Sequence, residues 1–245
     1  MITIVFILGL IIGSFLNVII YRMPRGESLV KPRSYCPDCG QKIKAFDLIP
    51  ILNYIWLKGR CRYCGSRINL HYPLVELVTA TALLLIYSEW GWSIDSLVAV
   101  ILAMLLIPAA VIDLHHGIIP DKISITGIII GLLISLLTTG FISSLMGALL
   151  FGGILLLAAY ISGGGMGGGD IKMAAAIGVF TGWQGAILAF MLSSILGGAV
   201  GVILLLSHQA NRKTAIKFGP FLALGGFIAY VWGARIMDFY LQVIN

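Results

Sequence analysis

The chain has 245 residues, a mean hydropathy of +1.02 and 11% charged residues, whereas an ordinary soluble domain carries about 25% charge. A soluble fold of this composition would expose an oily surface, so the lipid bilayer is the better solvent. The net charge of +6 does not indicate a nucleic-acid partner, because ten of the 16 basic residues cluster between Arg22 and Arg67.

Apolar segments along the chain predict an all-α polytopic membrane protein with about eight transmembrane helices. The first segment has no positive region before it and no small-residue cleavage site after it, which favours a retained helix over a signal peptide. The short segment at 171–184 is the exception, where a tilted, buried or re-entrant helix is the alternative. The predicted helices are residues 2–21, 73–89, 95–112, 123–140, 143–162, 171–184, 186–207 and 219–241.

The Lys and Arg distribution predicts the orientation, because cytoplasmic loops carry an excess of basic residues. If residues 22–72 are cytoplasmic, eight crossings put 113–122, 163–170 and 208–218 on the same side, with 15 of the 16 basic residues inside. Both termini are then outside. The predicted domains are a first helix at 1–21, a cytoplasmic subdomain at 22–72 within an N-terminal region of 1–92, and a membrane domain at 93–245.

Four cysteines form two pairs inside the polar segment. Cys36-Pro-Asp-Cys39 and Cys61-Arg-Tyr-Cys64 are separated by 21 residues, and a glycine follows each pair. Two such knuckles are typical of a tetrahedral four-cysteine zinc site, closed to substrate and structural in role. Reduced thiols without a metal and a redox-active CxxC are the alternatives; structural disulfides are disfavoured in a reducing compartment.

Two acidic residues occur at the ends of apolar helices, where a charge is costly unless it has a function. Asp113 ends one helix, and Asp170 follows the glycine-rich run 163–169 at the start of another. Both fall on the predicted cytoplasmic side. Two adjacent carboxyl groups share a proton, so one can activate water while the other polarises a peptide carbonyl. The plainer reading is that each carboxylate caps a helix.

Nearby polar residues are weaker candidates for chemistry. Asp121 is a rival to Asp113 and is read as a capping or supporting residue. His115 and His116 are read as interfacial polar residues, because adjacent positions do not share one helix face and no HExxH zinc motif occurs.

Several motifs together resemble the type IV prepilin peptidases, over nearly the whole chain. The resemblance extends from Gly13-Ser-Phe-Leu-Asn-Val-Ile-Ile-Tyr-Arg-Met-Pro24 through the paired cysteines and Gly167-Gly-Gly-Asp170, which fits the GxGD pattern. The interval between Pro24 and Cys36 is shorter than in some relatives. The other motifs are Asp47-Leu-Ile-Pro-Ile-Leu-Asn-Tyr54, Gly59-Arg-Cys-Arg-Tyr-Cys64, His71-Tyr-Pro-Leu-Val-Glu-Leu77 and Phe218-Gly-Pro-Phe-Leu-Ala223.

The resemblance implies that Asp113 and Asp170 are the catalytic pair of a GxGD-type membrane aspartyl protease in the bacterial inner membrane. It implies cleavage of type IV prepilins and pseudopilins after the Gly that ends a basic leader, in pilus, type II secretion or competence systems. It also implies methylation of the new N-terminus with S-adenosylmethionine. A basic leader that stays cytoplasmic would put the scissile bond at the depth expected for the pair.

The position of an S-adenosylmethionine site is the least constrained prediction, because the chain lacks a glycine-rich Rossmann signature. The candidates are Gly59, where a missing side chain would let a ligand approach, and Glu76, which has an ion pair with Arg22 as its alternative. Asn17 is read either as a contact between helices or as part of a site. A peptidase without methyltransferase activity is one alternative function, and a proton-coupled transporter is another.

Overall fold

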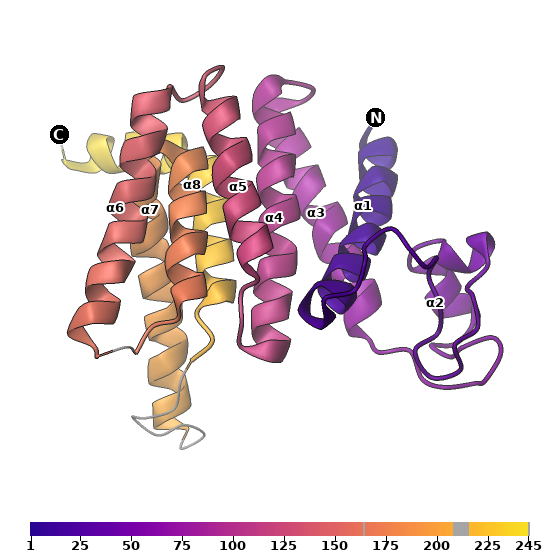
Figure 1. The fold of residues 1–245 in the computed structure, drawn as a ribbon. Helices are drawn as coiled ribbons and strands as arrows, with labels where there is room; N and C mark the ends of the chain where they lie inside the picture. The colour runs from indigo at the N-terminus through magenta and orange to yellow at the C-terminus, as the bar shows by residue number, and fades with distance from the viewer. Residues whose placement is uncertain (164, 208–215, 245) are drawn as a thin grey trace. The chain divides into compact units, whose positions relative to one another are not determined.

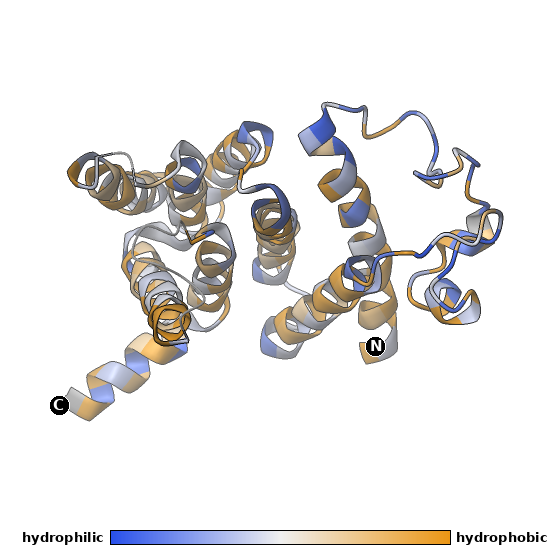
Figure 2. Ribbon diagram, turned by 90° about the horizontal axis from the view of Figure 1, so that it is seen from below, coloured by the Kyte–Doolittle hydropathy of each residue, from blue (hydrophilic) through white to orange (hydrophobic). Residues whose placement is uncertain are grey.

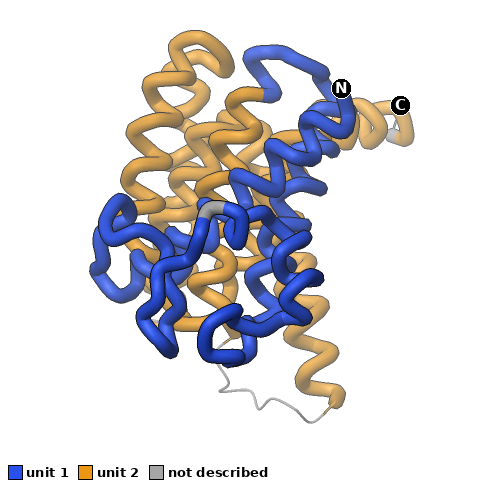
Figure 3. The backbone as a smooth tube through the Cα atoms, turned by 90° about the vertical axis from the view of Figure 1, so that its right-hand side faces the viewer, with its two compact units in different colours: residues 1–96 blue, residues 97–245 orange. Residues whose placement is uncertain are grey.

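The computed structural model describes residues 1–163, 165–207 and 216–244, and all its regular elements there are helical. The chain divides into two compact units, residues 1–96 and 97–245 (Figure 3). The elements are α1 Ile2–Arg22, η1 Met23–Arg25, η2 Ala45–Leu48, α2 Leu52–Trp56, α3 His71–Trp90, α4 Ile94–His116, α5 Asp121–Ser135, α6 Phe141–Ile161, α7 Gly168–Leu206 and α8 Gly219–Ile244 (Figure 1).

The first unit is built on an antiparallel pair of long helices, α1 and α3. Gly9 lies against Ala80, Gly13 lies against Glu76, and the Asn17 side-chain amide donates to the carbonyl of Tyr72 at 2.9 Å. Glycines four residues apart let two helix backbones approach closely, which is how helices associate where apolar burial gives no driving force. The small residues of α1 therefore fix its contact with α3.

Between α1 and α3 the chain forms a small polar subdomain. Each cysteine pair lies on a short hairpin closed by one antiparallel bridge, Tyr35 with Lys42 and Arg60 with Arg67. Between the hairpins lie η2 and the five-residue helix α2. Figure 2 shows hydrophilic residues gathered in this connecting segment, while the long helices are predominantly hydrophobic.

The second unit contains α5 to α8 and most of α4. Its longest helix, α7, is interrupted at Gly182, which has φ 68° and ψ −179°. A β-carbon at Gly226 would lie 2.8 Å from Ile177, and one at the neighbouring Gly225 would lie 2.8 Å from the Ser193 nitrogen. Residues 16 apart in one straight helix would be about 24 Å apart, so α7 folds back on itself at Gly182.

The helix lengths and surfaces suit a lipid environment. Six helices in the described part of the chain are long and apolar enough to cross a membrane, namely α1, α3, α4, α6, α7 and α8. Apolar side chains such as Leu149 and Leu157 of α6 face outward, whereas Ser124, Ser144 and Ser193 are buried. Apolar residues outside and small polar residues inside are typical of helices packed within a membrane.

The prediction of an all-helical membrane protein is confirmed, but the count of eight transmembrane helices is not. The predicted helix 123–140 is the 15-residue α5, about 22 Å long and shorter than a bilayer core of about 30 Å. The predicted helices 171–184 and 186–207 are the two limbs of α7. The basic residues Arg212 and Lys213 of the predicted loop 208–218 lie outside the described residues.

Candidate active site and metal centre

Asp113 lies in the last turn of α4 and is 5% exposed. Its Oδ2 accepts a hydrogen bond of 2.9 Å from the backbone N–H of Gly219, the first residue of α8. Beside it, Lys217 Nζ donates to the carbonyl of Leu114. The C-terminal end of α4 and the N-terminal end of α8 are therefore joined through Asp113.

Asp170 lies in the first turn of α7 and is half-buried. Its Oδ2 lies beside Gly167, where a β-carbon would come within 3.1 Å, and its Oδ1 is buried with no hydrogen-bond partner in the structure as described. The preceding Gly169 packs against Ile119, where a β-carbon would lie 3.0 Å from the Ile119 Cβ. The glycine run thus brings the start of α7 against the segment that follows α4.

The structure brings the two aspartates together. The carboxyl groups of Asp113 and Asp170 lie close enough to interact electrostatically, although 57 residues separate them in the sequence. Asp113 does accept a hydrogen bond from a helix start, as the capping interpretation expects. A cap, however, requires one carboxylate, and it does not account for a second, half-buried carboxyl group whose buried Oδ1 has no hydrogen-bond partner among the described residues.

Asp121 takes no part in this pair. Its carboxylate forms an ion pair with Lys172, with Nζ at 2.7 and 2.8 Å from the two oxygens. The bridge joins the first turn of α5 to the first turn of α7, so Asp121 supports the arrangement. His115 and His116 are exposed, with their rings 6.4 Å apart.

The four cysteines cluster as the spacing predicts. Their sulfur atoms all lie within 4.8 Å of one another, and none is in a disulfide. The Cys36 and Cys64 sulfurs are 3.9 Å apart, close to the edge of about 3.8 Å in a tetrahedron with zinc–sulfur bonds of about 2.3 Å. Gly40 and Gly65 have φ of 71° and 72°, which confirms the tight turn expected after each pair. This donor set fits a structural metal ion.

Ser66 supports the cysteine cluster from outside it. Its hydroxyl lies 3.1 Å from the Cys64 sulfur and 3.8 Å from the Cys36 sulfur. Hydrogen bonding by Ser66 lowers the pKa of the Cys64 thiol to about 6, which favours the thiolate that binds metal. Such outer contacts orient metal ligands and tune their basicity.

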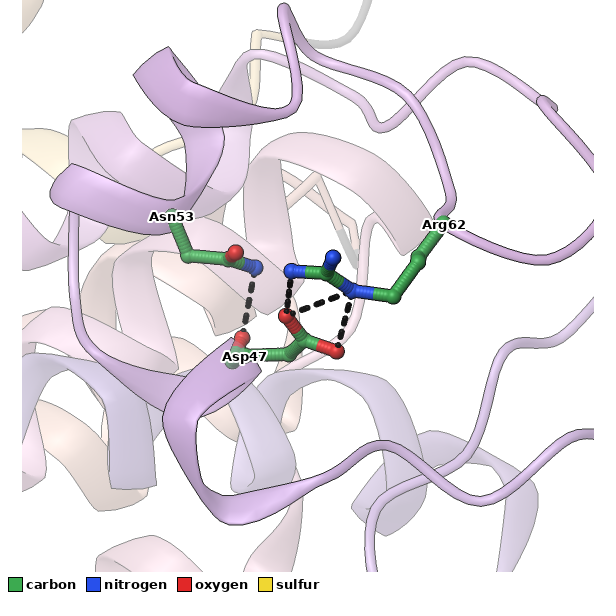
Figure 4. Close-up of polar contacts among 3 residues, drawn as sticks. All are labelled: Asp47, Asn53 and Arg62. Atoms are coloured by element: carbon green, nitrogen blue, oxygen red, sulfur yellow. Dashed lines mark hydrogen bonds and ion pairs between the residues drawn. The ribbon is translucent and has the colours of Figure 1, made fainter.

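A second contact ties the metal-binding hairpin to the segment before α2 (Figure 4). Arg62, between Cys61 and Cys64, donates to both carboxylate oxygens of Asp47 at 2.6 to 3.1 Å. The Asn53 side chain donates to the Asp47 carbonyl at 2.7 Å. The Asp47 side chain is 4% exposed. Its bidentate ion pair with Arg62 and the contact with Asn53 connect η2 to the second cysteine hairpin and to α2.

Of the two candidate cofactor residues, Glu76 belongs to α3 and contacts the residue before α2, and Gly59 lies three residues after the end of α2. Glu76 is buried, and its Oε2 accepts a hydrogen bond of 2.9 Å from the backbone N–H of Ile51. Gly59 has φ of 66°, and a β-carbon there would lie 2.8 Å from the Tyr54 hydroxyl. Both residues therefore have folding roles.

Two polar residues of the first helix, Arg22 and Asn17, have hydrogen-bond partners in the structure. The Arg22 guanidinium donates to the carbonyls of Ser28 and Pro32, at 2.9 and 2.8 Å, whereas the Glu76 carboxylate accepts from the backbone N–H of Ile51. Asn17 joins α1 to α3 through the Tyr72 carbonyl. Sequence reasoning missed Ser66 and the Gly219 contact with Asp113, although Gly219 belongs to the Phe218–Ala223 motif quoted above.

Comparison with known proteins supports one family throughout the chain. Residues 7–90 match the bacterial peptidase A24 N-terminal domain, and residues 100–202 match the type IV leader peptidase family. These two regions correspond to the two compact units. No solved structure matches the chain.

Several curated proteins named prepilin leader peptidase/N-methyltransferase align over nearly their full length. One from Bacillus subtilis (strain 168) is 38% identical, and the alignment covers 99% of both chains. One from Pseudomonas putida is 34% identical over 100% of this chain and 95% of the relative. One from Aeromonas hydrophila is 36% identical over 98% and 93%. The chain therefore belongs to the type IV leader peptidase family of enzymes.

Proposed function

We propose that this enzyme removes the basic leader from type IV prepilins and pseudopilins by cleavage after the leader's final Gly, with Asp113 and Asp170 as catalytic residues. The names of the full-length relatives support the substrate class. The observation that carries the assignment is the pair of carboxyl groups from α4 and α7, close in space and largely removed from water.

The chemistry follows from two carboxyl groups that hold one proton between them. The ionised carboxylate takes a proton from a water molecule, and the resulting hydroxide attacks the carbonyl carbon of the scissile peptide. The protonated carboxyl group donates to the carbonyl oxygen and stabilises the negative charge that develops there. Proton transfer to the leaving nitrogen then breaks the carbon–nitrogen bond and frees the amine of the mature pilin.

The position of the pair in the helices suits this substrate. Asp113 ends α4 and Asp170 begins α7, so both lie near helix ends and away from the middle of a membrane span. We place this end at the cytoplasmic face of the inner membrane, with both chain termini outside. That orientation requires eight crossings, with α5 and the two limbs of α7 each counted as one. A basic leader in the cytoplasm would then bring its junction with the apolar pilin helix to the pair.

Methylation of the new N-terminal amine is the second proposed activity, assigned to residues 1–92. It is supported by the N-methyltransferase names of the relatives and by the match of residues 7–90 to the N-terminal domain. S-adenosylmethionine would supply the methyl group. Gly59 and Glu76 stay predictions for its site.

Zinc is proposed to fold the subdomain and to take no part in catalysis. Four thiolates fill a tetrahedral coordination sphere and leave no position for substrate or water. Cys36, Cys39, Cys61 and Cys64 are the proposed ligands.

The test is mass spectrometry of the N-terminus of a co-expressed prepilin, which reports cleavage and methylation together. The wild-type chain should give a product shortened at the Gly junction and heavier by one methyl group. Asp95→Asn, at the other end of α4, is the matched control and should leave the product unchanged. An intact leader with the wild-type chain would contradict the proposed substrate, and an unmethylated product would contradict the second activity alone.

A further inference from the structure

The turn that begins α8 contacts the carboxyl group of Asp113 at the end of α4. The Gly219 N–H donates to Asp113 Oδ2 over a distance of 2.9 Å, between residues 106 apart in the chain. Lys217, two residues earlier, donates to the carbonyl of Leu114. Two successive contacts from one turn therefore hold residues 113 and 114 of α4.

The other backbone N–H groups in the first turn of α8 have acceptors of their own. The N–H groups of Phe221 and Leu222 both donate to the carbonyl of Phe218, at 3.0 and 3.1 Å, and Pro220 has no N–H group. Gly219 therefore contributes the first N–H of the helix that needs an acceptor from elsewhere. The acceptor is one oxygen of a proposed catalytic carboxyl group.

Residue 219 has no room for a side chain, because a β-carbon would clash with Asp113. A β-carbon there would lie 2.7 Å from Asp113 Oδ2, 2.9 Å from its Cβ and 3.0 Å from its Cγ. Real β-carbons essentially never approach other heavy atoms within 3.0 Å, so the Asp113 carboxyl group would have to move. Glycine is thus the residue that lets the N–H reach the carboxyl group without displacing it.

The two carboxyl groups consequently differ in their surroundings. Asp113 is held through Oδ2 by a backbone donor that cannot rotate away, because it belongs to a helix start. Asp170 has a buried Oδ1 with no hydrogen-bond partner among the described residues. One carboxyl group is fixed by a backbone donor, while the other has a buried oxygen that no described residue holds by a hydrogen bond.

We infer that Gly219 is a positioning residue of the catalytic pair: its N–H fixes the Asp113 carboxyl group, and its lack of a β-carbon leaves room for that group. This inference rests on the proposed function. Gly219 does not touch the reacting atoms in this account. It acts through Asp113, in a geometry where a displacement of about 1 Å costs on the order of 10²-fold in rate.

Steady-state cleavage of a fluorescent prepilin peptide in lipid nanodiscs tests the inference with Gly219→Ala. We expect kcat to fall by about 10- to 100-fold, with KM within a factor of about two, because Gly219 in this proposal acts on Asp113 and not on the substrate. Gly198→Ala and Gly233→Ala are matched controls. A β-carbon meets nothing within 4 Å at residue 198 and makes an ordinary 3.5 Å contact at residue 233.

If Gly219→Ala does not fold, Lys217→Gln provides the second measurement. Lys217 is exposed, and the shorter, uncharged glutamine side chain weakens its contact with the Leu114 carbonyl without crowding Asp113. We expect a several-fold loss in kcat that Lys217→Arg restores.

A Gly219→Ala enzyme with at least half of the wild-type kcat would overturn the inference. So would a change confined to KM, or an unaltered kcat for Lys217→Gln when Gly219→Ala does not fold. These failures are distinct from failure of the proposed function, which would appear as normal turnover by Asp113→Asn or Asp170→Asn.

Discussion

Gly13 of α1 lies so close to Glu76 of α3 that a β-carbon at residue 13 would come within 2.6 Å of the Glu76 Cα. The close approach predicts that Gly13→Leu separates the two helices. Overpacking typically costs about 1–3 kcal/mol, and the midpoint of thermal unfolding should fall accordingly. Gly153→Leu on α6 is the control, since a β-carbon there meets nothing within 4 Å. Equal thermal stability of the two variants would show that the α1–α3 contact is not tight.

The ion pair of Arg62 with Asp47 should matter more than that of Lys172 with Asp121. Asp47 is buried, so Arg62→Met leaves a carboxylate without its partner and should cost about 1–3 kcal/mol. Asp121 has a side chain 57% exposed, so Lys172→Met should cost less than about 1 kcal/mol. Chemical denaturation of both variants provides the comparison. A larger loss of unfolding free energy for Lys172→Met would contradict the greater contribution of the buried Arg62–Asp47 pair.

Metal content provides a separate prediction for the cysteine cluster. We expect one zinc ion per chain by elemental analysis, and a large loss of zinc from Cys61→Ser, because removal of one thiolate opens the tetrahedral site. Metal loss should unfold residues 22–72 and suppress methylation more than cleavage. Zinc-free protein with a protease-resistant subdomain would exclude a structural metal.

Two substitutions at Glu76 separate its folding role from a cofactor role. Glu76→Gln keeps a carbonyl oxygen that can accept from the Ile51 N–H, so stability should be retained, and methylation should fall only if the carboxylate charge contacts S-adenosylmethionine. Glu76→Ala leaves that N–H without its acceptor and should lower both. Loss of methylation by Glu76→Gln at unchanged thermal stability would instead indicate that the charge contacts S-adenosylmethionine.

Hydropathy located most helices in this chain because long apolar segments have few other uses. It failed at the end of α5, where Leu136 and Leu137 continue the apolar run although the helix has ended at Ser135. Composition alone does not mark that end. It did separate the two limbs of α7 near their actual boundary, where Gly182 takes up a left-handed φ that interrupts the helix.

The candidate site was predictable in its residue types and less so in its contacts. A carboxylate in an apolar helix is conspicuous, and paired CxxC motifs indicate a metal, so Asp113, Asp170 and the cysteines could be selected from the sequence. The hydrogen bond of Asp113 with Gly219 joins residues 106 apart through a backbone N–H. A backbone N–H is present in nearly every residue and gives no sequence signal. The bidentate ion pair of Arg62 with Asp47 also has no signal in the sequence.

The most direct test of the account is the turnover of purified Asp113→Asn and Asp170→Asn on a prepilin substrate, with thermal unfolding measured on the same samples. Each variant should unfold near the wild-type temperature and lose cleavage by about 10²-fold or more, because an amide neither takes a proton from water nor shares one with its neighbour. Near-normal cleavage by either folded variant would contradict the assignment of Asp113 and Asp170 as the catalytic pair.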